Sequence, residues 1–121
     1  KFFKEINIIK FKLLKLLKKI KSKNQSIHGY GASTKGNVLL QYFGIGNDKI
    51  DYIAERNPKK YELYTPGSKI KIISEKNSRI KKPNFYLVLP WHFQKEILSR
   101  EKKIRLKGTK FIFPLPKLKI Y

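Results

Sequence analysis

The segment with the clearest chemical potential is GYGASTKGN at positions 29–37, which lies between an apolar stretch and a helical pattern. Glycines at such a junction permit a tight turn and let backbone N–H groups approach a phosphate or carboxylate. The start of the following helix adds a partial positive charge, and Lys35 adds a full one. The spacing G-x-G-x-x-x-x-G matches neither the dinucleotide fingerprint nor the P-loop. The segment therefore predicts an anion-binding turn, and a turn needed only for close helix–strand packing is the alternative.

Two further segments could meet the same ligand. Glu55 ends the next apolar stretch, and an acid at this place in doubly wound nucleotide-binding folds accepts hydrogen bonds from a ribose. A solvated strand end is the alternative. Trp91 and His92 follow the most apolar stretch of the chain, and ligands of open α/β sheets bind outside the carboxyl ends of the strands. We therefore expect both side chains to face the same crevice, where His92 could carry a proton near neutral pH or simply cap and pack.

Together these segments supply the predicted ligand-binding residues, and we predict no catalytic or metal-binding residue among them. The candidates are Tyr30, Gly31, Ala32, Lys35, Gly36, Asn37, Glu55, Arg56, Asn57, Trp91 and His92. Lys35 and Arg56 are the candidates for a diphosphate. Spacing suggests no carboxylate pair, no Ser/His/Asp set and no metal-ligand cluster. The chain is predicted to be a binding domain.

An amphipathic helix is predicted at residues 2–20 because seven apolar residues share one side at helical pitch. They are Phe2, Ile6, Ile9, Leu13, Leu16, Leu17 and Ile20. We expect this apolar stripe to cover a sheet or a neighbouring domain. A basic helix lying on an anionic membrane has a similar sequence and is the alternative.

Beyond residue 24 short strands alternate with helices. Strands are predicted at 26–30, 50–55, 70–73, 84–89 and 110–113, with helices at 33–43 and 91–103 and a polar loop at 56–68. In the first helix we expect Val38, Leu39, Leu40 and Tyr42 to be buried, and in the second Glu96 and Arg100 are spaced for an ion pair. His28 is expected to be packed or exposed rather than functional. This alternation predicts an α/β, Rossmann-like three-layer domain with a mostly parallel sheet at 25–121, preceded by the helix at 1–24.

Charge is the most obvious feature of the composition, with 29 Lys plus Arg against 8 Asp plus Glu and a net charge of +21. A basic surface attracts phosphate, so nucleic acid is a possible partner. Only four of the basic residues are arginine, the residue best suited to reading bases and phosphates, and the chain also has 16 isoleucines. Since A/T-rich codons encode both Lys and Ile, genome composition explains the lysine excess equally well. A nucleic-acid partner is therefore disfavoured.

Length and composition fit one domain of 121 residues without a secretory signal or a membrane span. The absence of cysteine suits a reducing compartment, and the cytoplasm is the expected location. Because the chain begins at Lys1 in a helical pattern, we interpret it as the tail of a longer protein.

Five segments together resemble the C-terminal domain of SAM-dependent C-methyltransferases that act on nucleotide-linked keto-sugars. They are GYGASTKGNVLLQYFGI (29–45), IAERNPKK (53–60), TPGS (65–68), PNFYLVLPWHFQKEI (83–97) and GTKFIFPLP (108–116). The resemblance covers nearly all of residues 25–116. It implies a Rossmann-like substrate-binding domain that closes over the active site, holds the nucleotide-sugar and is inactive alone.

The resemblance also implies what lies elsewhere in the protein. S-adenosylmethionine would bind an upstream domain, zinc would bind a cysteine-rich N-terminal module, and residues 2–20 would pack this tail against its upstream partner. Two positions depart from the family pattern: Glu55 stands for the usual aspartate, and Ser68-Lys69 stand for a Thr-His pair. The alternatives to this function are a stand-alone nucleotide- or dinucleotide-binding module and a basic nucleic-acid-binding protein.

Overall fold

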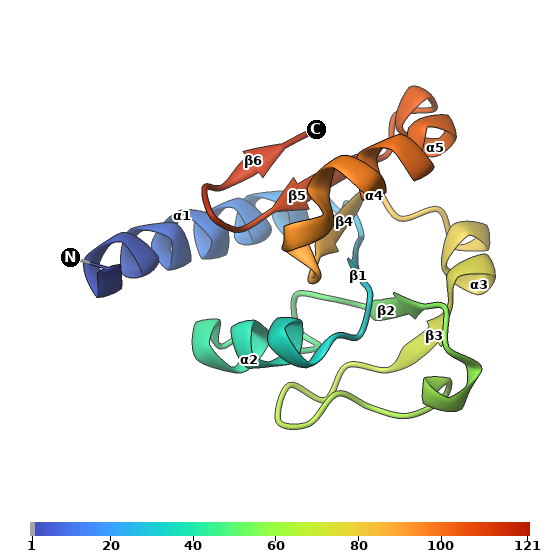
Figure 1. Cartoon of the computed structure of the whole chain (residues 1–121), viewed down its shortest axis with the longest axis horizontal. Coiled ribbons are helices and arrows are strands. Elements are labelled where there is room, and N and C mark those ends of the chain that lie inside the picture. Colours follow the sequence, from blue (N-terminus) through green and yellow to red (C-terminus); the bar gives the residue numbers. More distant parts are fainter. Residues whose placement is uncertain (1) are drawn as a thin grey trace.

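The structure is a computed structural model that describes the backbone of residues 2–121 and the side chains of residues 4–121. Figure 1 shows the path of the chain. The helices are α1 (Phe2–Ser22), α2 (Thr34–Phe43), α3 (Glu75–Ile80), α4 (Gln94–Arg100) and α5 (Lys102–Leu106), with 3-10 turns η1 (Pro58–Lys60) and η2 (Trp91–Phe93). The strands are β1 (Ile27–Tyr30), β2 (Tyr52–Glu55), β3 (Ile72–Ser74), β4 (Phe85–Val88), β5 (Lys110–Phe113) and β6 (Lys119–Ile120).

One six-stranded sheet in the order β3-β2-β1-β4-β5-β6 organises the domain. The first five strands are parallel, and only β6 runs antiparallel to its neighbour. Gly29 of the central strand β1 lies opposite Ile53 of β2 and Leu87 of β4. Strands are added first on one side of β1 and then on the other, so the β1–β4 boundary is the topological switch point where such sheets bind ligands. The predicted α/β fold with a mostly parallel sheet is confirmed.

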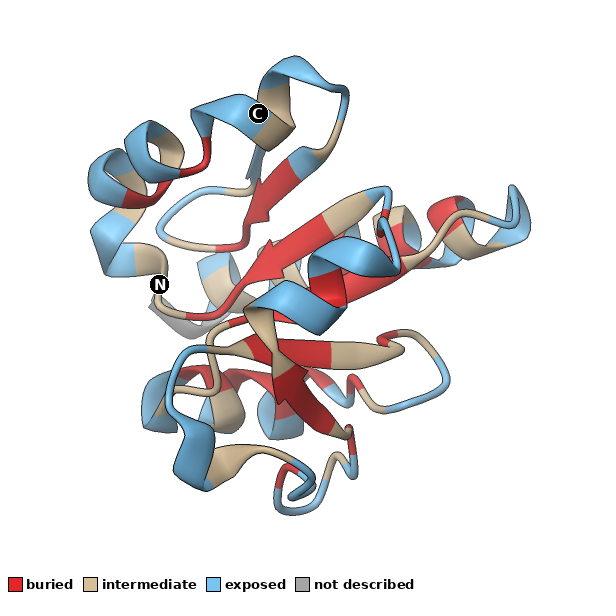
Figure 2. Cartoon of the chain, turned by 90° about the vertical axis from the view of Figure 1, so that its right-hand side faces the viewer, coloured by how far each residue is buried: buried red, intermediate tan, exposed pale blue. Residues whose placement is uncertain are grey.

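Helices cover both faces of this sheet, because alternate residues of each strand point to opposite sides. Ile27 belongs to the core cluster that α1 and α2 complete. Tyr30 belongs to the second cluster, which Ile97 of α4 and Ile104 of α5 join. Figure 2 shows the buried strands between helices whose outer sides are exposed. The predicted three-layer arrangement follows from these two cores.

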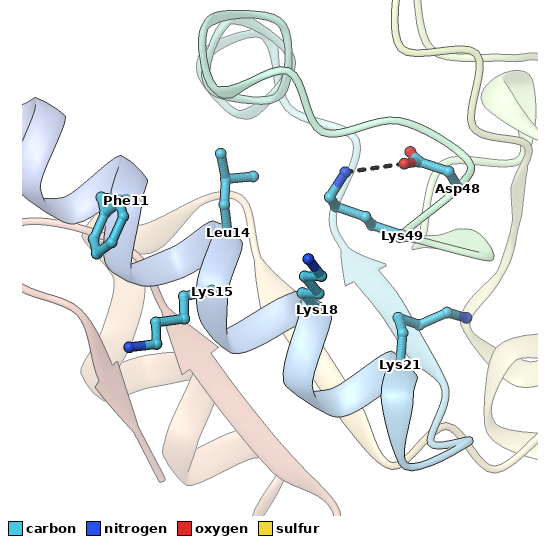
Figure 3. Close-up of a pocket in the computed structure, with 7 residues that line it drawn as sticks. All are labelled: Phe11, Leu14, Lys15, Lys18, Lys21, Asp48 and Lys49. Carbon is cyan, nitrogen blue, oxygen red and sulfur yellow. Dashed lines mark hydrogen bonds and ion pairs between the residues drawn. The ribbon is translucent and has the colours of Figure 1, made fainter.

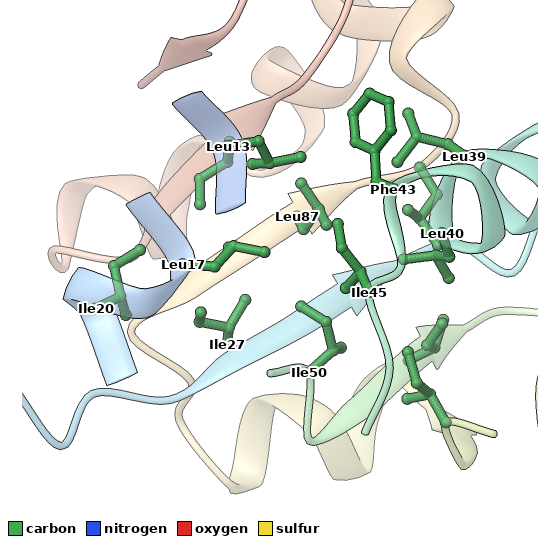
Figure 4. Packing of buried hydrophobic residues seen from close by; sticks show 14 of the residues in the cluster. Leu13, Leu17, Ile20, Ile27, Leu39, Leu40, Phe43, Ile45, Ile50 and Leu87 are labelled. Atoms are coloured by element: carbon green, nitrogen blue, oxygen red, sulfur yellow. The ribbon is translucent and has the colours of Figure 1, made fainter. Parts of the chain in front are cut away.

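The apolar stripe of α1 covers the sheet. Leu13 and Leu17 are completely buried, and Ile20 is 3% exposed, all within the cluster that contains Ile27 and Leu87 (Figure 4). Phe2, the first predicted member of the stripe, lies outside the described side chains. Because the sheet occupies the stripe, it is not available to a membrane surface, and none of the described helices is long and apolar enough to span a bilayer.

Several local predictions were wrong. Val38 and Tyr42 of α2 are 60% and 48% exposed, and Phe43 is buried on this helix instead. The helix predicted at 91–103 is a 3-10 turn followed by two short helices, which separate at Glu101 because that side chain turns inward. The sequence reading also omitted α3 and β6.

Arg100 does not form the predicted ion pair with Glu96 among the described residues. Its guanidinium contacts Glu75 (3.0 Å) and Glu101 (3.2 Å) instead.

His28 is packed, which is one of the two placements that the sequence left open. The ring is 2% exposed, and Nδ1 lies 2.7 Å from Ser78 Oγ, which in turn lies 2.6 Å from Tyr86 Oη. Burial lowers the pKa of His28 from 6.5 to about 4; nearby Lys81 and Lys21 act in the same direction and Asp51 opposes them. His28 is therefore neutral in the folded chain at neutral pH.

This burial makes the stability of the chain depend on pH in a defined window. The unfolded chain binds a proton at His28 near pH 6.5 and the folded chain only near pH 4, so stability falls as the pH falls between these values. From pH 6.5 to pH 5 the loss of unfolding free energy should be about 2 kcal/mol. Urea denaturation at several pH values measures it.

The variant His28→Asn keeps a polar atom near the position of Nδ1 but cannot titrate, so its stability should hardly change in this window. His92→Asn is the matched control, because His92 is exposed. This variant should show the same fall of unfolding free energy with falling pH as the wild type. If the unfolding free energy of wild type and of His28→Asn depended equally on pH, His28 would not be the source of the pH dependence.

Candidate functional site

The predicted glycine turn leaves the carboxyl end of β1 at the switch point. Gly31 has φ +83°, a conformation that side chains disfavour, and its N–H donates to Ala54 O at 2.8 Å. A Cβ at this position would lie 3.0 Å from Cδ of Pro90, which follows β4. The turn therefore links β1 to β2 by a hydrogen bond and lies close to the end of β4. Because Gly31 has no side chain, its backbone is accessible at this edge of the sheet.

Gly36 serves close packing. It is buried in the first turn of α2, and an added Cβ would lie 2.3 Å from Cβ of Leu89. The N-cap Ser33 accepts the Gly36 N–H at 3.0 Å, which fixes the start of the helix. The packing role that we gave as the alternative for the glycine segment is thus the observed role of this glycine.

Glu55 ties the glycine turn to the loop after β2. One carboxylate oxygen accepts the N–H of Ala32 at 2.7 Å, and the other accepts the N–H groups of Arg56 (3.0 Å) and Asn57 (2.8 Å). Lys60 Nζ donates to Ala32 O at 2.8 Å and closes the same connection. A carboxylate offers about four acceptor positions, so Glu55 keeps only one for a ligand.

A hollow of about 330 Å³ opens beside this connection at the carboxyl edge of the sheet. Four predicted residues line it: Tyr30, Gly31, Glu55 and Arg56. Arg56 is exposed, and its guanidinium makes no ion pair within residues 4–121. The structure therefore brings the glycine turn and the loop after β2 to one site, as predicted.

The remaining predicted residues lie elsewhere. Ala32 and Asn37 line a second hollow of about 420 Å³ between α2 and residues 60–66. Lys35 and Trp91 line a third, apolar hollow of about 230 Å³ between α1 and α2. The rings of Trp91 and the exposed His92 stack at 4.6 Å. Trp91 and His92 are thus not among the residues that line the hollow beside Glu55.

Asn57 is exposed and serves as the N-cap of η1, accepting the Lys59 N–H at 3.1 Å. Eight of the eleven predicted residues thus line three different hollows, whereas Gly36 and Asn57 have structural roles and His92 stacks on Trp91.

Residues of α3, η2 and α4 complete the first hollow, and sequence reasoning missed them. They are Glu75, Phe93, Glu96, Ile97 and Arg100, next to Pro90. Phe93 is 55% exposed and lines the same hollow as Arg56 and Arg100. The available signal in the sequence was that Phe93 directly follows the predicted Trp91 and His92.

A charged cluster behind the hollow fixes Arg100. The buried carboxylate of Glu101 accepts the Tyr30 O–H at 2.5 Å and two hydrogen bonds from Arg79 at 3.0 and 3.1 Å. Arg100 donates to Tyr30 Oη, to Glu75 and to Glu101. Four of the chain's eight acidic residues gather here, in a protein of charge +21. The concentration of acidic residues at this edge of the sheet is therefore unlike the composition of the rest of the chain.

Burial and hydrogen bonding set the protonation of this cluster. Burial alone would raise the pKa of Glu101, but hydrogen bonds from Tyr30, Arg79 and Arg100 bring it below its ordinary value of 4.5. Burial, with the hydrogen bond to Glu101, raises the pKa of Tyr30. At neutral pH Tyr30 is a neutral donor to an ionised Glu101. The hollow thus combines the guanidinium groups of Arg56 and Arg100 and the exposed Phe93 with the carboxylates of Glu55, Glu75 and Glu96.

Comparison with known proteins gives two findings. The profile of a family described as "C-methyltransferase C-terminal domain" matches residues 1–116. The chain is also 30% identical over 112 residues to the C-methyltransferase NovU of Streptomyces niveus. This alignment covers 93% of the chain but only 27% of that relative, so the chain spans about a quarter of the relative's length.

Proposed function

Because this chain belongs to the family of C-methyltransferase C-terminal domains, we propose that it is the substrate-binding and lid domain of a SAM-dependent enzyme that methylates a carbon of nucleotide-linked keto-sugars. The observation that carries the proposal is the hollow at the β1–β4 switch point, where Gly31, Arg56 and Arg100 meet. Such an edge binds nucleotides in related folds. In this proposal SAM binds the upstream part of the complete protein, so the domain alone is inactive.

Each residue of the hollow has a definite part in this proposal. Arg56 and Arg100 donate to the diphosphate, because the planar guanidinium group matches phosphate oxygens. Gly31 lets the ligand approach the backbone, and Phe93 offers its ring to the base. Tyr30 and Glu101 act through Arg100, which they hold in place.

The upstream part of the complete protein supplies the chemistry. SAM, when bound there, donates the methyl group, and a base removes the proton beside the sugar ketone. The domain contributes by holding the nucleotide-sugar so that the reacting carbon is placed and water is excluded. A zinc module and a cytoplasmic location stay predictions from the sequence.

Binding of nucleoside diphosphate sugars tests the placement. We expect calorimetric titration of UDP-glucose and dTDP-glucose to show binding of at least one, and Arg56→Ala to weaken it about tenfold, the value of one charge-assisted hydrogen bond. Arg56→Lys should recover part of the loss, because it keeps the charge without the planar fork.

Lys35→Ala is the matched control, since Lys35 is exposed and lines a different hollow. Loss of affinity in Lys35→Ala but not in Arg56→Ala would move the site to the α2 side and contradict the proposal. Tight binding of NAD without binding of nucleotide-sugars would support a stand-alone dinucleotide module instead.

A further inference from the structure

Residues 117–121 lie beyond the part of the chain that the family profile matches, which ends at residue 116. They nevertheless belong to the sheet, because β6 pairs with β5. The Tyr121 N–H donates to Phe111 O, and the Phe111 N–H donates to Tyr121 O, both at 2.8 Å. The Tyr121 ring lies edge-on to Phe113, with centroids 5.7 Å apart, and packs against the second core cluster. The backbone and the ring of Tyr121 therefore have fixed positions.

The hydroxyl of Tyr121 reaches the start of α4. Gln94 is the first residue of this helix, and its Nε2 donates to Tyr121 Oη at 2.7 Å. Within the described part of the chain, no other side-chain hydrogen bond reaches residues 91–97. Neither η2 nor α4 has a side chain that caps its first turn. The bond to Tyr121 therefore takes the place of a cap at the η2–α4 junction.

This junction carries one wall of the hollow at the carboxyl edge of the sheet. Phe93 directly precedes Gln94, and it lines the hollow together with Glu96 and Ile97 of α4. The Phe93 ring is 55% exposed, so little packing fixes it from outside. Its position consequently depends on the backbone of the junction, which Gln94 connects to Tyr121.

We propose that Tyr121 is a positioning residue for the nucleotide site, because through Gln94 it holds the junction at which Phe93 meets the nucleobase. The inference rests on the proposed function, which assigns the base to Phe93. Tyr121 acts at a distance, since it is not among the residues that line the hollow. A ring that is held in place before the ligand arrives loses less conformational entropy on binding, so affinity is higher.

A competing site for an anionic ligand lies on the other face of the sheet. Lys15 and Lys18 of α1 line a hollow of about 610 Å³ together with Phe11 and Lys49 (Figure 3). This hollow adjoins the core cluster that α1 completes, whereas Tyr121 packs against the other cluster. Removal of the Tyr121 hydroxyl should therefore leave binding at the lysines unchanged.

The substitution Tyr121→Phe tests the inference, because it keeps the ring and removes only the hydroxyl. We expect the Kd for UDP-glucose or dTDP-glucose to rise about fivefold, the value of one neutral hydrogen bond. Gln94→Met should cause the same rise, and the double variant should show no further one. An unchanged Kd in Tyr121→Phe would overturn the inference.

Two controls accompany this titration. Tyr42→Phe removes a hydroxyl that donates to Asn7 at 3.5 Å on the α1 side, and it should leave the Kd unchanged. Lys18→Ala reports on the competing hollow and should also leave the Kd unchanged. A rise of the Kd in Lys18→Ala but not in Tyr121→Phe would place the ligand beside α1 and overturn the inference.

A double-mutant cycle with Phe93→Ala separates positioning from a general loss of stability. In this background Tyr121→Phe should change the Kd by less than about twofold, because no ring is left to hold. A fivefold rise in both backgrounds would show that Tyr121 only stabilises the fold, and would overturn the inference.

Amide hydrogen exchange of the free chain tests the same contact without a ligand. In Tyr121→Phe the amides of α4 should exchange at least about fivefold faster, and those of α2 at the wild-type rate. Unchanged exchange in α4 would overturn the inference. Binding that depends on Arg56 but not on Tyr121 would refute only the positioning role. Faster exchange in a chain that binds no nucleotide-sugar would refute the proposed substrate, and with it the role of Tyr121 toward a nucleobase.

Discussion

Replacing Gly36 with alanine should lower the free energy of unfolding by about 3 kcal/mol, because the new methyl group has no space. Its Cβ would lie 2.3 Å from Cβ of Leu89 and 2.8 Å from Ser33 Oγ. Neither Leu89 nor Ser33 can move away easily, since Leu89 follows a buried central strand and Ser33 is the N-cap of α2. Alanine's better helix propensity recovers only about 1 kcal/mol, so α2 must move away from the sheet. Urea denaturation measures the change.

The matched control is Gly44→Ala at the other end of α2. Gly44, unlike Gly36, has a positive φ (+68°), and an added Cβ there meets nothing within 4 Å. The strain of this conformation alone should cost about 1 kcal/mol. Equal losses for the two substitutions would show that contact with Leu89 is not the reason for the glycine at position 36.

The second large effect is expected for Glu101→Gln, which should destabilise the chain by about 3 kcal/mol. The substitution keeps the shape of the side chain but removes the charge that Arg79 and Arg100 share. The new amide group would also direct N–H donors toward guanidinium donors. Since Glu101 holds Arg100 at the hollow, Glu101→Gln should weaken nucleotide-sugar binding as well.

The pH dependence identifies the cause. The pKa of Glu101 is below its ordinary 4.5, so the stability from its ionisation is present above pH 4.5 and is lost as the pH falls below that value. Glu101→Gln should therefore lose less stability than the wild type on acidification below pH 4.5. Glu96→Gln, on the exposed side of α4, should change stability by less than about 0.5 kcal/mol. A similar loss in Glu96→Gln would show that the α4 charges act generally rather than through the cluster.

Strand positions could be predicted closely because local signals agree. The apolar stretch before Pro90 and the glycines after Ile27 each combine β-forming residues with a clear stop, so β1 and β4 lie where expected. The carboxyl-end rule then placed Gly31 beside Glu55 without any knowledge of distances. Local pattern and sheet geometry were sufficient for this half of the site.

The other half depended on contacts between distant residues. Glu101 interrupts the helix predicted at 91–103 because Tyr30 and Arg79, far away in sequence, draw its carboxylate inward. Helical spacing suggested a pair between Glu96 and Arg100, whereas Glu75 of α3 takes that arginine. The six-residue α3 is too short to show periodicity, although Ser74 caps it. Periodicity also could not tell which side of α2 meets the sheet, so Val38 and Tyr42 were assigned to the core.

The two margins of the sheet determine how the chain behaves at high concentration. Beyond β3, residues 62–65 already use the outer backbone groups of Ile72, whose N–H donates to Leu63 O at 2.8 Å and whose carbonyl accepts the Glu62 N–H at 2.9 Å. On the opposite margin β6 has only two residues, and one of them is Lys119. A foreign strand therefore finds little exposed main chain to extend the sheet, which protects the fold against polymerisation into β-aggregates.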